Sequence, residues 1–241
     1  MYRYFYDLHI HSCLSPCGDN DMTPNNIVNM SALKNLDVIA VCDHNTVKNC
    51  RSAAKAAKNN GLGVIVVPGA EITTSEDVHV LVYFPDFDAA EAFEADILGK
   101  NRVLIKNNPA IFGEQLILNE FDEKTGEEEN LLINATGLSV DGVFRAAREY
   151  GAAAVPAHID KTANGIIGIL GDYPGHLKKF PAEIHDGGKA AGTAGRYGLT
   201  GKILSSSDAH YLWDILEPGS ILESDVKITG ANEIVKNLTI S

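Results

Sequence analysis

Strand-like and helix-like segments alternate along nearly all of this chain of 241 residues. Short apolar runs rich in β-branched and aromatic residues are followed by longer segments with helical periodicity and capping residues. This alternation predicts an α/β fold in which helices cover a mostly parallel sheet, either open or closed into a barrel. We expect strands at residues 3–10, 37–42, 64–67, 78–84, 152–156, 182–185 and 202–206, with a last strand and helix over about 219–238. We expect helices at residues 24–35, 47–59, 88–98 and 138–150.

One segment interrupts the alternation. Residues 100–137 hold a short helix-like piece and then an acidic run around Lys124-Thr125-Gly126. Because like charges are tolerated best where water screens them, we interpret this segment as an insertion with an exposed acidic turn. The Gly-rich stretch 187–201 lacks the spacing of a Walker loop, and we interpret it as a flexible connector. The chain, residues 1–241, is then one domain with one insertion.

The composition is that of an ordered globular protein, with 45% hydrophobic and 22% charged residues. The formal net charge of -12 disfavours binding to duplex nucleic acid or to an anionic membrane surface. The sequence shows neither an apolar run of about 18 residues nor a signal peptide, so we expect a cytoplasmic protein. All four cysteines lie in the first fifty residues at spacings that fit no zinc ribbon, and we interpret them as thiols.

Histidines collect at the ends of the predicted strands. Seven of the eight lie at or just beyond the carboxyl ends of strands, and they are His9, His11, His44, His79, His158, His185 and His210. The carboxylates Glu71 and Asp208 occupy similar positions. In parallel α/β folds, the loops that follow the strands build the active site. His9 and His11 are two residues apart on one strand, so their rings point to the same face.

Imidazoles and carboxylates brought together in this way are ligands of divalent transition metals such as zinc, manganese or iron. A single histidine on an apolar strand is more often a core residue whose ring nitrogens are hydrogen-bonded within the protein. His79 or His185 alone would therefore be weak evidence for a metal site. Two rings on one face repel each other when protonated and gain from a shared cation. Histidine, aspartate or glutamate at six separate strand ends therefore predicts a metal centre.

The ordered motifs resemble those of the PHP (polymerase and histidinol phosphatase) family. They are Asp7-Leu-His-Ile-His-Ser, Asp43-His-Asn, Gly69-Ala-Glu, His79, Pro156-Ala-His and Ser207-Asp-Ala-His, and the resemblance covers about residues 5–225. It implies a distorted (β/α)7 barrel that binds up to three metal ions and hydrolyses phosphoesters. The ligands that it implies are His9, His11, Glu71 and Asp208 at one metal, Glu71, His79 and His158 at a second with Glu71 bridging, and His44 with His210 at a third.

The third site needs one more ligand from the loop that follows His11. This loop is longer than the Ser-Asp-Gly form common in the family. Counting back from Thr23 favours Asp19, with Asp21 or Cys17 as alternatives. The departure from the family pattern leaves the occupancy of the third site open.

Other side chains have expected supporting roles. Asp7 and Asp43 are placed to accept the second ring N–H of ligating imidazoles and so to orient them. Four side chains in the later strand ends and loops are candidates for contact with a substrate phosphate, and they are Lys161, His185, Lys189 and Arg196.

The metal chemistry and the resemblance together predict a metal-dependent phosphoric ester hydrolase. Two to three divalent ions would activate a hydroxide near neutral pH, held at His9, His11, Glu71 and Asp208, and would neutralise charge on the phosphoryl oxygens. We expect the substrate to be a small phosphomonoester, a nucleotide or the end of an oligonucleotide. The alternatives are a metal-dependent hydrolase of C–N bonds, as in the amidohydrolases, and a metal-binding regulatory module without turnover.

Overall fold

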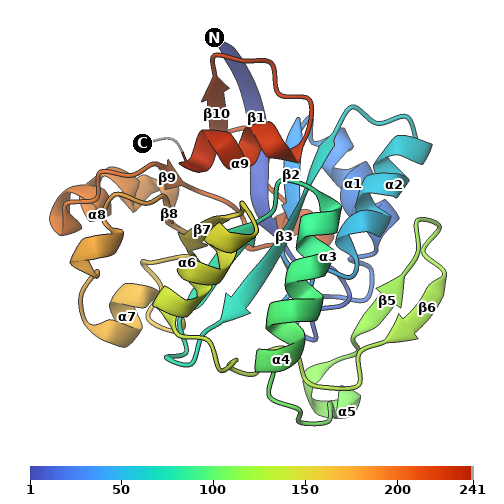
Figure 1. Cartoon of the computed structure of the whole chain (residues 1–241). Coiled ribbons are helices and arrows are strands. Elements are labelled where there is room, and N and C mark those ends of the chain that lie inside the picture. The colour runs from blue at the N-terminus through green and yellow to red at the C-terminus, as the bar shows by residue number, and fades with distance from the viewer. Residues whose placement is uncertain (240–241) are drawn as a thin grey trace.

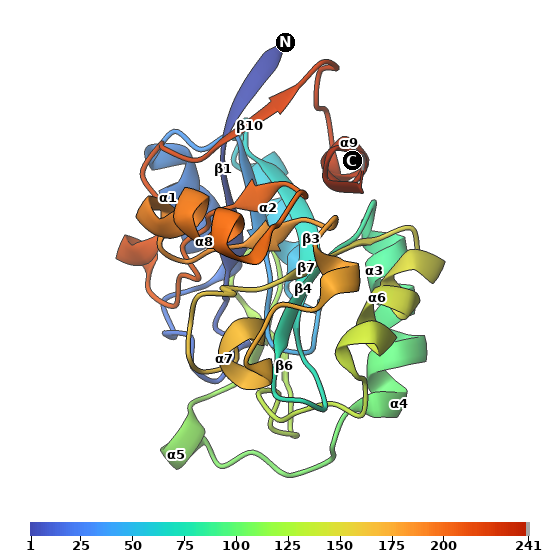
Figure 2. The same ribbon diagram turned by 90° about the vertical axis from the view of Figure 1, so that its left-hand side faces the viewer.

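A computed structural model describes residues 1–239 and shows a curled sheet with helices packed outside it (Figure 1, Figure 2). The strands are β1 (Tyr2–Ile10), β2 (Val38–Val41), β3 (Ile65–Thr73), β4 (His79–Tyr83), β5 (Leu116–Leu118), β6 (Lys124–Glu127), β7 (Ala153–Pro156), β8 (Ala182–Glu183), β9 (Ile203–Leu204) and β10 (Ile221–Ser224). The α-helices are α1 (Pro24–Leu33), α2 (Cys50–Asn59), α3 (Phe87–Phe93), α4 (Gly99–Asn101), α5 (Pro109–Phe112), α6 (Val140–Glu149), α7 (Ile166–Leu170), α8 (Ala190–Tyr197) and α9 (Ala231–Thr239). A π-helical segment, Glu94–Leu98, joins α3 to α4, and short 3₁₀ turns lie at Gly175–Leu177, Gly187–Lys189 and Leu212–Asp214.

The central sheet has the strand order β10-β1-β2-β3-β4-β7. β1, β2 and β3 are parallel, whereas β4 is antiparallel to both of its neighbours and β10 is antiparallel to β1. The expectation of a mostly parallel sheet is therefore wrong for these two strands. For β4 the cause is local, because residues 74–78 connect it to β3 and are too few for the crossover that a parallel neighbour requires.

A second pair of strands closes the sheet into a barrel. β8 and β9 are parallel to each other, and the N–H of Ile159, which follows β7, donates to the carbonyl of Glu183 in β8 (2.9 Å). On the other side, Ala209 follows β9 and pairs with Ile10 at the end of β1, and its carbonyl accepts the N–H of His11 (2.9 Å). β1, β2, β3, β4, β7, β8 and β9 thus form one circuit, which confirms the expected distorted barrel.

Apolar side chains fill this barrel toward one end. Leu8 of β1, Val67 of β3 and Tyr83 of β4 belong to one buried cluster. The same cluster includes Ile234 and Leu238 of α9, which packs on β3 and β7. At the opposite end, where β1, β2 and β3 finish, the buried residues are polar. The barrel therefore has an apolar end, covered by α9, and a polar end.

The outer layer follows local sequence signals. α1 begins at Pro24, and the side chain of its N-cap Thr23 accepts the N–H of Asn26. Ser139 caps α6 in the same way, and Gly151 takes a left-handed conformation (φ 64°) just after that helix. Both helices bury apolar residues in the core outside the sheet. Within residues 1–239, the helices are too short or too polar to span a bilayer.

The segment interpreted as an insertion contains a hairpin that is tied to the rest of the chain. β5 and β6 pair antiparallel, and residues 119–123 connect them. Lys124-Thr125-Gly126 lies within β6 and not at the turn, contrary to expectation. The carboxylate of Asp122 accepts hydrogen bonds from Thr23 Oγ1 (2.6 Å) and from the N–H of Asn25 (3.0 Å). The acidic turn is therefore anchored to the start of α1 and is not simply solvated.

Candidate metal centre

The polar end of the barrel brings together eight of the nine predicted metal ligands. They are His9 from β1 and His11 just after it, Glu71 from β3, His79 from β4, and His44, His158, Asp208 and His210 from loops that follow β2, β7 and β9. His79 comes from the amino end of its strand, not from the carboxyl end as predicted. Because β4 is antiparallel to β3, its first residue lies beside Thr73 at the end of β3. The antiparallel strand thus reaches the same site from the opposite direction.

Glu71 lies at the centre of this cluster and is only 1% exposed. Its Oε1 atom is 2.8 Å from Nδ1 of His79 and 3.0 Å from Nε2 of His158. Its Oε2 atom is 3.2 Å from Nδ1 of His44 and 3.3 Å from Nε2 of His11. One carboxylate therefore faces imidazoles with both of its oxygens, which is the arrangement required of a ligand that bridges two cations.

His9, His11, Glu71 and Asp208 form one group, in which one ligand atom from each lies within 4.8 Å of the others. The Nε2 atoms of His9 and His11 are 3.2 Å apart, so the two rings converge as their spacing on β1 predicts. Oδ1 of Asp208 is 3.3 Å from the first of these nitrogens and 3.1 Å from the second. Asp208 has a φ of 55°, in the left-handed region that residues other than glycine rarely adopt outside functional sites and turns.

His44, Glu71 and His79 form a second group within the same limit, and His158 contacts the same carboxylate. Within residues 1–239, Nδ1 of His44 is buried and makes no hydrogen bond, although it faces Oε2 of Glu71 at 3.2 Å. A buried ring nitrogen that lacks a hydrogen bond is costly. A cation between the nitrogen and the carboxylate would satisfy both, so the residues present fit a metal.

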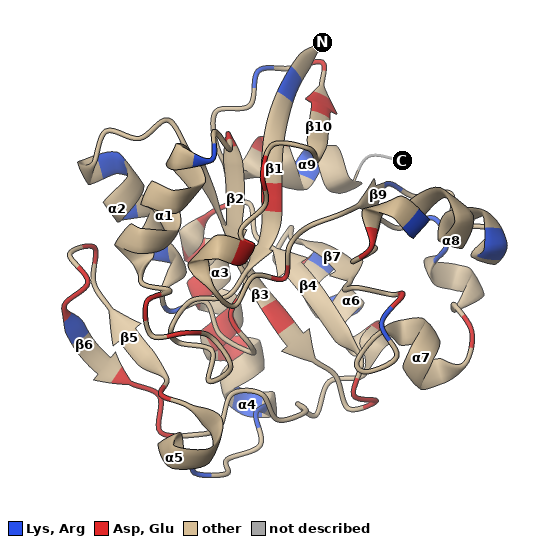
Figure 3. Cartoon of the chain, turned by 180° about the vertical axis from the view of Figure 1, so that it is seen from behind, with Lys and Arg blue, Asp and Glu red and all other residues tan. Residues whose placement is uncertain are grey.

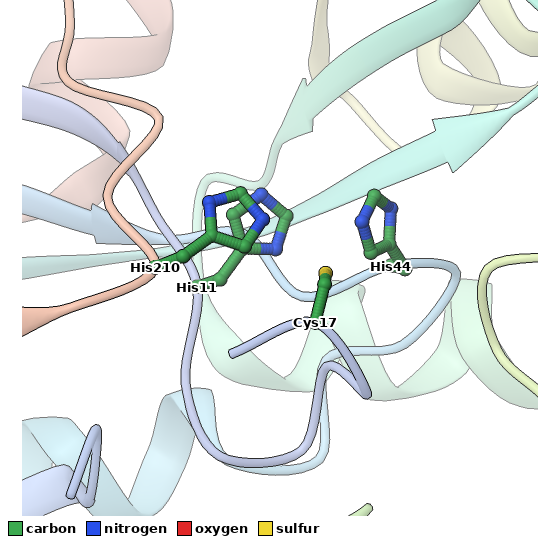
Figure 4. A group of neighbouring side chains, drawn as sticks. All are labelled: His11, Cys17, His44 and His210. Atoms are coloured by element: carbon green, nitrogen blue, oxygen red, sulfur yellow. The ribbon is translucent and has the colours of Figure 1, made fainter. Parts of the chain in front are cut away.

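His11, Cys17, His44 and His210 form a third group (Figure 4). Cys17 lies on an exposed loop, yet its sulfur points toward the three imidazoles (Figure 4). All four cysteines of the chain are free thiols, as predicted. The third group differs from the other two because sulfur takes the place of a carboxylate oxygen.

Asp19, which the sequence favoured as the extra ligand, belongs to none of these groups. Its carboxylate instead accepts the N–H of Asp21 (2.8 Å), and Asp21 itself is exposed. The loop makes a tight turn at Gly18, where a Cβ atom would lie 2.5 Å from a backbone oxygen. This turn separates Cys17, which faces the imidazoles, from Asp19, which does not.

Neighbouring charges shift the pKa values of the clustered groups. Burial acts to lower the pKa of His11, but hydrogen bonds to Asp208 and Glu71 and their negative charges raise it to about 9. Burial acts to raise the pKa of Glu71, but the surrounding histidines hold it well below its usual range. At His210 burial dominates and lowers the pKa to about 4. Glu71 is therefore ionised, and its charge must be balanced by protons or by divalent cations.

Glu183, which was not among the predicted site residues, contacts one imidazole and the backbone of a second histidine. Its Oε2 atom lies 3.0 Å from Nδ1 of His9 and accepts the backbone N–H of His158 (3.0 Å). The side chain is buried at the end of β8, two residues before His185. The only signal in the sequence was a carboxylate at a strand end. Its position predicts that it orients His9 and raises the basicity of the other ring nitrogen.

Asp7 and Asp43 are also buried, but their hydrogen bonds differ from those expected. The carboxylate of Asp7 accepts the N–H of Ser207 (3.0 Å), which holds the loop that follows β9. The carboxylate of Asp43 accepts from Oγ of Ser15 (2.7 Å), and that oxygen lies 3.0 Å from Nδ1 of His11. Asp43 therefore reaches an imidazole through one hydroxyl group, and Asp7 positions a loop.

Of the four expected substrate contacts, Lys161 reaches the cluster. Its Nζ atom donates to Oδ2 of Asp208 (2.6 Å), and the side chain is 35% exposed. Within residues 1–239, no hydrogen bond or ion pair joins the cluster to the other three, His185, Lys189 and Arg196. The last two line a separate pocket of about 420 Å³. Most of the segment predicted as a flexible connector, residues 187–201, is helical, because a 3₁₀ turn and α8 cover residues 187–197; that prediction was wrong.

The sequence matches the PHP domain family over residues 7–194, and the chain therefore belongs to this family. It is 29% identical over 219 residues to the 5′-3′ exoribonuclease Rnm of Salmonella typhimurium, a match that covers 87% of this chain and 72% of that protein. The 5′-3′ exoribonuclease Rnm of Escherichia coli is 27% identical over the same length, with the same coverage. As a member of this family, the chain is a metal-dependent phosphoric ester hydrolase.

Solved structures share the fold. The lesion-specific endonuclease PfuEndoQ of Pyrococcus furiosus aligns with a TM-score of 0.64 at 18% identity, covering 98% of this chain and 56% of that one. Endonuclease Q in complex with a 27-mer duplex that has an abasic lesion at the active site aligns with a TM-score of 0.61 at 19% identity and the same coverage. This chain thus spans little more than half of the endonuclease Q chain.

The expectation that this chain would not bind duplex nucleic acid is contradicted by these relatives. Endonuclease Q holds a duplex at its active site, and the Rnm proteins are exoribonucleases. Figure 3 shows Lys and Arg positions scattered over several elements, among them α2, β6, α4 and α8. Net charge was a poor guide because carboxylates that bind metal ions add to the formal negative charge without repelling a phosphate once those ions are bound.

Proposed function

We propose that this chain is a metal-dependent nuclease that removes nucleotides from the 5′ end of RNA. The observation that carries the proposal is the position of Glu71, which is shared by two groups of histidine and carboxylate ligands. Two cations held close together are a common device for the hydrolysis of phosphodiesters. The likeness to two 5′-3′ exoribonucleases over 87% of the chain supports RNA as the substrate.

We infer that two to three divalent transition metal ions, zinc, manganese or iron, bind at this end of the barrel. The first two positions would use His9, His11, Glu71 and Asp208, and Glu71 with His79 and His158, while His44 and His210 would serve a third. When bound, these ions would lower the pKa of a water molecule and neutralise charge on the phosphoryl oxygens.

The side chains around the cluster would hold the ligands and the substrate in place. Glu183, through its contact with Nδ1 of His9, would keep the other nitrogen of that ring directed at the first position. The Lys161 ammonium group, which now contacts Asp208, is near enough and exposed enough to move to a phosphate oxygen. Lys161 would therefore bind the scissile or the adjacent phosphate.

The test uses RNA oligonucleotides labelled at the 5′ end or at the 3′ end, with added Mn²⁺ or Zn²⁺. A 5′-3′ exonuclease releases labelled mononucleotide at once from the 5′-labelled RNA and produces a ladder of shortened products from the 3′-labelled RNA. The comparison substrates are single-stranded DNA of the same sequence, a duplex with an abasic site, and p-nitrophenyl phosphate as a small phosphomonoester. His9→Ala controls for contaminating nucleases, and its preparation should be inactive.

Two outcomes would contradict different parts of the proposal. Release of mononucleotides from the 3′ end would exclude the proposed 5′-3′ direction. Activity on the duplex alone, or on p-nitrophenyl phosphate alone, would exclude RNA as the substrate. A lack of metal-dependent hydrolysis with every substrate would exclude a nuclease.

A further inference from the structure

We propose that Cys17 is a thiolate ligand of the third metal position and makes that position selective for thiophilic cations. The inference rests on the proposed metal-dependent function. It chooses among the three residues that the sequence left open, which are Cys17, Asp19 and Asp21. It also separates the third position chemically from the other two.

The geometry of the third group supports this assignment. Cys17 contributes a sulfur atom, and His11, His44 and His210 contribute ring nitrogens, all within 4.8 Å of one another. The ring centroids of His11 and His210 are 4.3 Å apart, and those of His11 and His44 are 4.6 Å apart. Figure 4 shows the sulfur beneath the gap between these rings. A cation there would contact nitrogen and sulfur ligands at once, as zinc does in mixed sites.

The loop that bears Cys17 is held in this position from two sides. The N–H of Asp19 donates to the carbonyl of His210 (2.9 Å), so the backbones of the two ligand-bearing loops are joined directly. On the other side, Gly113 of the insertion lies so close to Pro16 that a Cβ atom would be 2.1 Å from its carbonyl oxygen. Only glycine fits this contact, and its φ of 101° also favours glycine. Cys17 is thus presented by a loop whose neighbours fix its course.

A sulfur ligand changes which metal ions the third position prefers. The two groups around Glu71 offer nitrogen and oxygen atoms alone, which suit manganese as well as zinc or iron. A thiolate favours zinc and other thiophilic cations over manganese and magnesium. The three positions should therefore fill differently when the protein is loaded with different metals.

The first experiment measures bound metal by elemental analysis after loading the metal-free protein with Zn²⁺ or with Mn²⁺. We expect three equivalents of zinc and two of manganese in the wild-type protein. Cys17→Ser should bind two equivalents of either metal, a loss of one zinc. Because Cys17 is exposed on its loop, we expect the variant to fold, and circular dichroism checks this.

The second experiment uses cobalt, whose bond to a thiolate gives a strong charge-transfer absorption in the near ultraviolet. The wild-type protein loaded with Co²⁺ should show this band, and Cys17→Ser should lack it. Asp19→Asn is the matched control, because Asp19 lies two residues away, was the favoured candidate in the sequence, and directs its carboxylate to the N–H of Asp21. This variant should keep both the band and the third zinc.

The outcomes separate this inference from the proposed function. A band of unchanged strength in Cys17→Ser, or the loss of one zinc in Asp19→Asn but not in Cys17→Ser, would overturn the role of Cys17 while leaving a metal-dependent nuclease intact. A wild-type protein that binds metal and shows the band but hydrolyses no RNA would contradict the nuclease and leave the thiolate ligand in place.

Discussion

The two parts of the proposed metal centre stand on different kinds of backbone. The groups around Glu71 are built on three strand residues, His9, Glu71 and His79, and the first two are almost fully buried. The third group depends on loops, with Cys17 exposed and the side chain of His210 25% exposed. Strand ligands are fixed by the register of the sheet, whereas loop ligands depend on the length and turns of each loop. We therefore expect the inner groups to set catalysis and the outer group to vary in the metal that it binds.

Neutralising Glu71 should have the largest effect, because this one carboxylate faces five imidazoles. Glu71→Gln keeps the shape but removes the charge, so more than one equivalent of metal should be lost. We expect kcat on RNA to fall roughly 100- to 1,000-fold, the scale observed when a preorganised electrostatic contact is lost. Metal analysis and steady-state kinetics measure the two effects.

The matched control for this change is Glu120→Gln. Glu120 lies in the hairpin turn, and its carboxylate is 3.7 Å from Nζ of Lys55, far from the chemistry proposed here. This variant should keep wild-type metal content and kcat. If Glu71→Gln retained its full complement of metal, the idea of a shared bridging carboxylate would have to be abandoned.

Glu183→Gln should have the next largest effect on metal affinity, and it should affect the inner groups around Glu71 alone. The variant keeps an oxygen that can accept the N–H of His158 but loses the charge beside Nδ1 of His9. Replacing such a partner of a metal-binding histidine lowers metal affinity or activity roughly 10- to 100-fold. Metal titration should show the loss at one position while the cobalt–thiolate band of Cys17 persists. Simultaneous loss of that band would mean that the inner and outer groups do not bind metal independently.

The contrast between strands and loops also explains what the sequence could predict. The convergence of His9 and His11 followed from a period of two along β1, and their Nε2 atoms do meet. Glu71 and Asp208 were found because they follow apolar strands. By contrast, counting along the loop favoured Asp19 over Cys17, because the course of this loop depends on contacts with distant residues, His210 and Gly113.

The antiparallel strand and the supporting residues were missed for related reasons. The sequence predicts a strand at residues 78–84, but its direction depends on the connection from β3, residues 74–78, which is too short for a parallel crossover. His185 was predicted as a site residue and Glu183 was not, because one carboxylate at a strand end is weak evidence for a functional role when its hydrogen-bond partner is unknown. The pairing of Glu183 with His9 joins residues 174 positions apart, and only the closed barrel reveals it.

Lys161 and Lys189 offer a smaller test of which cation meets the substrate. Lys161→Ala removes the ammonium group that contacts Asp208, so KM for RNA should rise about tenfold, in line with the loss of one charge-assisted hydrogen bond. Lys189 pairs with Asp186 (2.8 Å) beside α8, and Lys189→Ala should change KM little. Equal effects of both substitutions on KM would indicate that the RNA path runs over α8 as well.

The smallest expected effect tests His11, which, like His44, belongs both to an inner group and to the third group. Oγ of Ser15 lies 3.0 Å from Nδ1 of His11, and His11 belongs to both the first and the third group. Ser15→Ala should cost about 1 kcal/mol, the usual net value of one hydrogen bond, which is roughly a fivefold loss of metal affinity. Because His11 is shared, this loss should appear at an inner position and at the outer one, whereas Cys17→Ser should weaken the outer position alone. Titrations with zinc that showed the Ser15→Ala effect at a single position would assign His11 to one group.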